Sequence, residues 1–177
     1  MSDPKPTVPF PNTYWVVPKK FLAGEHPGDL NEAVLKARLL ELLDAGIRTF
    51  VDLTEERELD SYYEWLREVA EEERVEVTFV RIPIPDRGVP SVWTLQRILN
   101  LIDDSLADGK PIFIHCFAGI GRTGTVVGCY LQRHGLATET DVIPRIAELR
   151  RFMPIACESS PHTPEQVRMV ENWKREA

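Results

Sequence analysis

The sequence has few cysteines and no long apolar run, and each deficit excludes a class of protein. Its three cysteines, at positions 116, 129 and 157, are an odd number without the spacing of a disulfide framework, so we expect a reducing compartment. No apolar run approaches the roughly 18 residues of a transmembrane helix, and residues 1–18 lack the apolar segment of a signal peptide. Together these absences predict a cytoplasmic protein.

Basic residues are scarce relative to acidic ones. The chain has 21 Lys and Arg against 28 Asp and Glu, which gives a formal net charge of −7. Nonspecific nucleic-acid binding and docking on an anionic membrane both depend on an excess of basic side chains, so we expect neither partner. An anionic substrate would have to be captured by a local positive site.

The apolar content, by contrast, is ordinary. At 43% hydrophobic residues, a chain of 177 residues can form one domain with its own core. Residues 1–13 are rich in proline and predict an extended arm. We expect residues 14–177 to form a single domain, without internal repeats, and a monomer is favoured.

Hydrophobic spacing predicts strands that alternate with helices. β-Prone runs cover residues 14–17, 21–24, 47–53, 75–84 and 112–114. Helical spacing covers residues 31–45, 92–106, 125–134, 139–152 and 163–173. Nine acidic residues between positions 55 and 73 predict one more, solvated helix. This order is typical of an α/β fold with a central, mostly parallel sheet of four to five strands flanked by helices.

The segment HCFAGIGRTG, residues 115–124, carries the strongest chemical signal in the chain. It follows a β-prone run and leads into a helix, whose unpaired N–H groups and dipole favour an anion. Cys116 stands at the entrance of the loop and Arg122 at its exit, and both the amides and the guanidinium favour a thiolate. The same groups would hold three phosphoryl oxygens. The predicted phosphate-binding residues are Phe117, Ala118, Gly119, Ile120, Gly121 and Arg122.

Three other interpretations of this segment are weaker. Residues 119–124 also fit the dinucleotide pattern G-x-G-x-x-G, but that pattern needs an acidic residue after a second strand about 20 positions on. Glu139 and Asp141 stand there, in a predicted helix. The Walker pattern requires lysine where the chain has Arg122. A buried structural role for Cys116 would leave the flanking glycines and the arginine unexplained.

Residues 115–124 match the pattern H-C-x-x-G-x-G-R-[ST]-G, through which the chain resembles the cysteine-based protein tyrosine phosphatases, in the form used by their small dual-specificity branch. The resemblance implies a phosphatase-like fold and hydrolysis in two steps, with attack by Cys116 on phosphorus and hydrolysis of the phosphocysteine by water. It also implies that the Thr123 hydroxyl donates to the sulfur and that His115 orders the loop. Neither a metal nor another cofactor is expected.

A leaving oxygen needs a proton, so an acid is expected outside the loop. Asp86 is our candidate, because Ile84-Pro85-Asp86 resembles the W-P-D acid loop of the family and follows a strand that could neighbour the one before Cys116. Asp52, at the end of a buried strand, is the competing acid, although such a position is more typical of a structural carboxylate. By resemblance to the Q-T-x-x-Q segment of the family, Gln166 helps to position the hydrolytic water.

The expected substrate is a phosphorylated protein or peptide. The chain is too short for the tyrosine-recognition insertion of the larger enzymes, so we expect a shallow cleft for phosphotyrosine, with phosphoserine and phosphothreonine as further substrates. A phosphoinositide is less favoured, because Phe117, Ala118 and Ile120 stand where lipid-directed relatives often have lysines.

Two alternatives to this function stay open. The first is a catalytically idle phosphoprotein reader, which the intact Cys116, Arg122 and Asp86 disfavour. The second is a nucleotide-binding redox protein on the dinucleotide interpretation. A separate hypothesis, which rests on the resemblance, is that Cys129 or Cys157 traps oxidised Cys116 as a disulfide. Cys129 is expected to be too remote, because it lies along the helix that leads away from the loop, and the sequence does not place Cys157.

Overall fold

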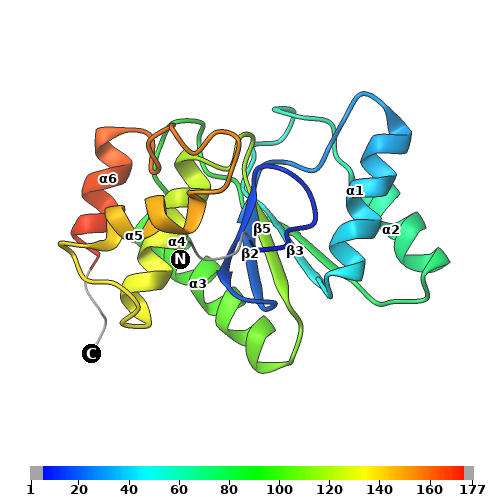
Figure 1. Ribbon diagram of the computed structural model, residues 1–177, viewed down its shortest axis with the longest axis horizontal. Coiled ribbons are helices and arrows are strands. Elements are labelled where there is room, and N and C mark those ends of the chain that lie inside the picture. The colour runs from blue at the N-terminus through cyan, green and yellow to red at the C-terminus, as the bar shows by residue number, and fades with distance from the viewer. Residues whose placement is uncertain (1–5, 174–177) are drawn as a thin grey trace.

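A computed structural model describes residues 6–173 (Figure 1). The first five residues of the predicted arm and residues 174–177 lie outside this part. Five strands form one sheet in the order β1-β2-β5-β3-β4, in which β1 and β2 are antiparallel and the other pairs are parallel. The predicted α/β fold with a mostly parallel sheet is therefore confirmed. The strands are β1 (Thr13–Val17), β2 (Phe21–Gly24), β3 (Thr49–Asp52), β4 (Thr78–Arg81) and β5 (Ile112–His115).

Both faces of the sheet are apolar, and each face packs against its own core. Alternate strand residues point to opposite sides, so Ile112 and Ile114 join one core while Phe113 joins the other. Strands buried on both faces are hydrophobic along their whole length, which is why the sequence shows continuous apolar runs. The central strand β5 is covered in this way and ends at His115, directly before Cys116.

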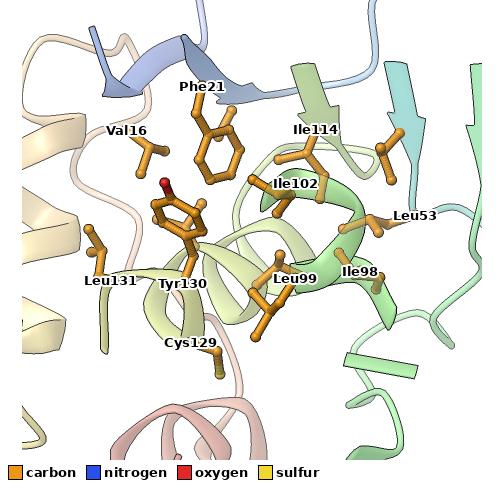
Figure 2. Packing of buried hydrophobic residues seen from close by; sticks show 14 of the residues in the cluster. Val16, Phe21, Leu53, Ile98, Leu99, Ile102, Ile114, Cys129, Tyr130 and Leu131 are labelled. Carbon is orange, nitrogen blue, oxygen red and sulfur yellow. The ribbon is translucent and has the colours of Figure 1, made fainter. Parts of the chain in front are cut away.

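Two helices cover one face of the sheet and four lie on the other side (Figure 1). The first pair is α1 (Glu32–Asp44) and α2 (Tyr63–Glu72); the second group is α3 (Val92–Ala107), α4 (Gly121–Arg133), α5 (Val142–Arg150) and α6 (Pro164–Glu171). Figure 2 shows the larger core, in which Tyr130 of α4 meets Phe21 of β2 edge to face with ring centres 4.9 Å apart. None of the helices between residues 6 and 173 has the length and apolar character needed to cross a bilayer.

Helix starts follow the capping residues that the sequence contains. The side chains of Asn31 and Ser91 accept hydrogen bonds from the first turns of α1 and α3. Thr163 and Gln166 form a reciprocal capping box at the start of α6. Helix α4 begins at Gly121, four residues before the predicted start, so the signature segment itself supplies its first turn.

The prediction of a helix throughout residues 55–73 is wrong in its first half. Residues 54–61 form turns, and α2 begins only at Tyr63. Within the turns Arg57 adopts a positive φ of 72°, a conformation that a non-glycine residue takes only under outside constraint. The side chains of Glu55 and Glu58 instead accept hydrogen bonds from the Asp86 amide and from the Arg122 guanidinium, which lie far along the chain.

The expectation that the strand before Asp86 could neighbour β5 is also wrong. Strand β4 is the edge strand, and β3 lies between it and β5. The chain nevertheless returns toward the centre after β4, because the Ile84 N–H donates to the Leu53 carbonyl at 3.0 Å. This bond brings the segment around Asp86 back over the end of β3.

Candidate active site

Cys116 lies on the floor of a small pocket at the carboxyl ends of the strands, where parallel sheets bind their ligands. The pocket has a volume of about 190 Å³, and Cys116 itself is 3% exposed. It is bounded by the loop from β5 to α4, by the segment around Asp86 and by the start of α6. The lining residues are Asp86, Arg87, Cys116, Phe117, Ala118, Ile120, Gly121, Arg122, His162 and Gln166.

The loop at the floor presents unpaired donors. Within residues 6–173, the backbone N–H groups of residues 117–121 have no hydrogen-bond acceptor. They belong to the turn that leads into α4, whose N-terminus adds partial positive charge. The structure therefore brings together the predicted anion donors around Cys116.

Close contacts with the end of β2 fix the shape of this loop. Gly119 has a positive φ of 70°, and a Cβ atom there would lie 2.3 Å from the carbonyl carbon of Gly24. Only glycine fits such an approach. The His26 N–H donates to the Phe117 carbonyl at 2.9 Å, and the Ser160 hydroxyl donates to the Ile120 carbonyl at 2.8 Å. The loop carbonyls thus point outward to partners, and its amides are left for a ligand.

Arg122 is buried and held by an acid that the sequence did not mark. Its Nη1 and Nη2 donate to the two carboxylate oxygens of Glu58 at 2.7 and 2.5 Å, and Nη1 also donates to the Ile84 carbonyl at 3.2 Å. Burial disfavours the guanidinium charge and lowers the pKa of Arg122. The hydrogen bonds that Arg122 donates to Glu58 outweigh this effect, so the pKa is raised. The edge of the guanidinium that carries Nε faces away from Glu58 and can donate to a second anion.

Asp86 stands beside this arginine at the mouth of the pocket. Its Oδ1 lies 3.2 Å from Arg122 Nη2, and its side chain is 64% exposed. The acid loop is held from two sides: the Asp86 N–H donates to Glu55 Oε2 at 3.1 Å, and Gln166 Nε2 donates to the Gly88 carbonyl at 2.9 Å. The loop therefore has a defined position although its carboxylate faces water.

The competing acid, Asp52, is fully buried and committed to structural partners. One oxygen accepts from the amide and hydroxyl of Thr54, and the other accepts from Arg81 at 3.0 and 2.8 Å. Burial alone would raise the pKa of Asp52, but the nearby His115 and the bonds from Thr54 and Arg81 bring it below its usual value. Asp52 also does not line the pocket, so the structural interpretation fits it better.

A layer of buried rings supports the loop from below. His115 Nδ1 lies 3.1 Å from the Cys116 carbonyl, which can only accept, so Nδ1 carries the proton and Nε2 accepts from the Tyr62 hydroxyl at 2.8 Å. Burial lowers the pKa of His115 and raises that of Tyr62, so both stay neutral. His26 meets both rings edge to face at 5.2 Å. His115 thus lies where it can order the loop.

Two other predicted residues lie at the site with different contacts from those expected. The Thr123 hydroxyl is buried and forms no hydrogen bond within residues 6–173, so the expected donation to Sγ is not made in this state. Gln166 lines the pocket, but its Oε1 accepts from the amides of His162 and Thr163 and its Nε2 holds the acid loop. Its observed contacts tie α6 to the segment around Asp86.

The remaining cysteines and possible metal ligands lie apart from this chemistry. Cys116, Cys129 and Cys157 are all free thiols. Cys129 is fully buried on α4, and burial raises its pKa, whereas Cys157 is exposed. Within the described residues, no group of three His, Cys, Asp or Glu side chains is arranged to bind a metal ion.

The residues that sequence reasoning missed are mostly those that hold the loops. Glu58, Glu55 and Tyr62 all come from the stretch interpreted as a solvated helix, and no glycine or proline there indicates a turn. No motif in the sequence marks His26 either, because its N–H donates to the Phe117 carbonyl, 91 positions away in the chain. Only the folded sheet brings these residues to one edge.

Comparison with known proteins gives matches along most of the chain. The family model described as "Polymorphic toxin system, DSP-PTPase phosphatase" matches residues 27–136. Dual specificity protein phosphatase CDC14A of Mus musculus is 32% identical over 132 residues, covering 73% of this chain and 21% of that protein. Receptor-type tyrosine-protein phosphatase C of Mus musculus is 37% identical over 83 residues, covering 43% of this chain and 6% of that protein. The chain spans a minor part of the length of these curated relatives.

Solved structures match the fold across nearly the whole chain. The crystal structure of Tk-PTP in the active form has a TM-score of 0.72 at 24% identity and covers 93% of this chain and 97% of that one. The structure of PTPMT1 in complex with PI(5)P has a TM-score of 0.65 at 22% identity, with coverage of 92% and 94%. At such identities these matches establish a common fold.

The buried histidines predict an acid-sensitive fold. Burial, with His115 as a neighbour, lowers the pKa of His26 to about 3, so the unfolded chain binds a proton below pH 6.5 that the folded chain excludes. The free energy of unfolding should then fall with decreasing pH, by up to about 1.4 kcal/mol per pH unit for each such imidazole. The pKa values of Asp52 and Glu58 are lowered, so above pH 5 both carboxylates are ionised in the folded and in the unfolded chain. They therefore contribute little to the change in the free energy of unfolding with pH in that range.

Urea unfolding between pH 5 and 7 measures this slope. His26→Asn should reduce the slope by the contribution of one proton, about 1.4 kcal/mol per pH unit. The asparagine oxygen keeps an acceptor for the Gly28 amide, which in the parent protein donates to His26 Nδ1. The matched variant His162→Asn changes an exposed histidine and should leave it unaltered. An unchanged slope in His26→Asn would mean that His26 is protonated in the native state.

Proposed function

The chain belongs to the DSP-PTPase phosphatase family described for polymorphic toxin systems, and on that premise we propose that it is a phosphoprotein phosphatase. It hydrolyses phosphotyrosine, with phosphoserine and phosphothreonine as further substrates, through a phosphocysteine intermediate. The observation that carries this proposal is one pocket that holds Cys116, Arg122 and the unpaired amides of residues 117–121.

The cradle supports the binding of a phosphoryl group above the sulfur. The amides of residues 117–121 would donate to the oxygens that spread the charge in the transition state. Arg122 would add its Nε and the Nη2 hydrogen that now faces Asp86, since Glu58 occupies the edge between Nη1 and Nη2. The roles of Phe117, Ala118, Gly119, Ile120 and Gly121 are therefore those of main-chain donors.

The first step transfers the phosphoryl group to the enzyme. The Cys116 thiolate forms a bond to phosphorus while the bond from phosphorus to the leaving oxygen breaks, and Asp86 transfers a proton to that oxygen. Asp86 now pairs with Arg122, so the arriving phosphoryl group must take over this donor. The displaced carboxyl is then beside the leaving oxygen at the mouth of the pocket.

The second step regenerates the enzyme. Water attacks phosphorus, Asp86 takes its proton, and the sulfur–phosphorus bond breaks to release orthophosphate and the thiolate. The unpartnered hydroxyl of Thr123 is the proposed donor to the departing sulfur. If Gln166 acts on this water, it would do so through the second hydrogen of its Nε2, because its other polar positions already have partners.

The pocket dimensions support a broad choice of phosphorylated residue. The cavity is small, at about 190 Å³, and Phe117 in its wall is 59% exposed. An aryl group could pack on this ring, while a shorter serine or threonine side chain could still reach the floor. A catalytically idle reader would use the same cradle, and the first experiment below separates it from an enzyme.

Substituting Cys116→Ser should reduce hydrolysis of p-nitrophenyl phosphate, assayed with chelator present, to the background rate, because a hydroxyl at this position is a far weaker nucleophile. Binding of a phosphotyrosine peptide should persist. Cys157→Ser is the matched control, since that thiol is exposed and outside the pocket, and it should keep full activity. No turnover by the parent protein, with peptide binding retained, would instead identify a reader.

Asp86→Ala should slow phenyl phosphate by roughly 10²–10⁴-fold and p-nitrophenyl phosphate much less, because only the poorer leaving group needs a proton. The variant keeps the main-chain bond from residue 86 to Glu55, so the loop should hold its place. The measurement is kcat/KM for both esters. Equal slowing of the two would remove Asp86 as the general acid.

Glu58→Gln should lower kcat/KM for p-nitrophenyl phosphate by about 10–100-fold, because one charge-assisted partner of Arg122 becomes a neutral one. Inhibition by orthophosphate should weaken in parallel, since both anions use the same guanidinium. Glu56→Gln, two positions earlier and exposed, is the control and should behave like the parent protein. Unchanged inhibition in Glu58→Gln would show that Arg122 binds the anion equally well without a charged partner at position 58.

A further inference from the structure

A second, larger cavity adjoins the candidate active site on the side of α1 and α2. Its volume is about 710 Å³, compared with about 190 Å³ for the pocket above Cys116. Phe117 and Ala118 line both hollows, so the two share one wall. A polypeptide whose phosphorylated side chain enters the small pocket would cross this wall into the larger cavity.

The walls of the larger cavity include apolar side chains that are open to water. Leu30 is fully exposed and Phe117 is 59% exposed, while Trp65 of α2 lines the cavity as well. Large apolar side chains gathered around a hollow are typical of binding sites, because a ligand that covers them removes apolar surface from water. The cavity therefore has the composition of a site for an apolar side chain.

The same cavity carries an excess of negative charge. Glu25, Asp29 and Asp60 line it, and Arg38 is the single lysine or arginine in its wall, so three carboxylates against one guanidinium leave two negative charges. His26 does not offset them, because burial lowers its pKa to about 3. An anionic ligand would be repelled from this cavity.

Arg38 is itself committed to the protein. Its Nη1 donates to the carbonyls of Pro27 and Gly28 at 3.4 and 3.3 Å, and its guanidinium lies 5.3 Å from the ring centre of Phe10. By contrast, Asp60 forms no ion pair with any of residues 6–173. The carboxylate charge of Asp60 is thus available to a ligand.

We propose that this cavity binds the segment of the phosphoprotein substrate that flanks the phosphorylated residue, and that it selects a lysine or arginine next to an apolar side chain. The inference rests on the proposed function, since the flank is placed only if the phosphoryl group binds above Cys116. A cation can pair with the carboxylates and pack on an aromatic face. The Trp65 ring already holds the Lys36 ammonium at 4.8 Å from its centre.

Two phosphotyrosine peptides test the proposal, one with leucine and arginine on both sides of the phosphotyrosine and one with leucine and glutamate. Their affinities for the Cys116→Ser protein are measured by fluorescence anisotropy, which requires no turnover. We expect the arginine peptide to bind about tenfold more tightly at low salt and the difference to shrink as salt is added.

Two substitutions locate the effect in the cavity, each made in the Cys116→Ser protein. Asp60→Asn should cut the preference for arginine by about three- to fivefold. Leu30→Ser should weaken both peptides equally. The matched controls are Asp108→Asn and Leu136→Ser, exposed residues outside both cavities, and they should change neither affinity. Made in the active protein, all four should leave hydrolysis of p-nitrophenyl phosphate within about twofold of the parent.

Equal binding of the two peptides, or a preference that Asp60→Asn does not alter, would overturn the proposal. So would tighter binding of vesicles containing a phosphoinositide than of the arginine peptide, since that outcome needs a cavity that accepts anions. The proposed function fails separately, if the parent protein does not hydrolyse p-nitrophenyl phosphate. In that case the difference in affinity between the arginine and glutamate peptides still decides whether the cavity selects a basic residue next to the phosphotyrosine.

Discussion

The site depends on one constraint: the amides of residues 117–121 must stay unpaired while other contacts fix the shape of the loop that carries them. Unpaired N–H groups are costly in a buried setting, so the loop keeps its shape only because other contacts hold it. The packing of Gly119 against Gly24 and the bond from His26 to the Phe117 carbonyl supply this support. The sheet, by placing β2 beside β5, brings those partners to the loop.

The same edge of the sheet joins the arginine to the acid loop. The Glu58 carboxylate accepts two hydrogen bonds from Arg122, while the Glu55 carboxylate, three residues earlier, accepts one from the Asp86 amide. The Glu55 amide in turn donates to Glu58 Oε2 at 2.9 Å, so the two acids form one unit. A single turn after β3 therefore sets the separation of the Arg122 guanidinium and the segment that carries Asp86, which are the proposed phosphate-binding group and the proposed proton donor. The buried Asp52 anchors the start of that turn through Thr54.

Sequence reasoning reached the elements whose causes are local. Short β-prone runs predicted the strands, and helical spacing predicted most of the helices. Both ends of the signature segment follow from a strand, glycines and a helix N-terminus. It failed where charge composition was read as a solvated helix. Glu55 and Glu58 look like surface acids in the sequence because their partners are far along the chain.

The sequence by itself determined that Cys116 and Arg122 lie at opposite ends of one short strand-to-helix connection, because only six positions separate them and Arg122 falls in the first turn of α4. Tertiary structure alone decided which acid faces that arginine, since Glu58 and Arg122 are 64 positions apart. It also decided that Asp86 reaches the loop from an edge strand, across β3. Periodicity records which face of an element is buried, whereas such pairings depend on how the packed layers bring distant turns to one edge.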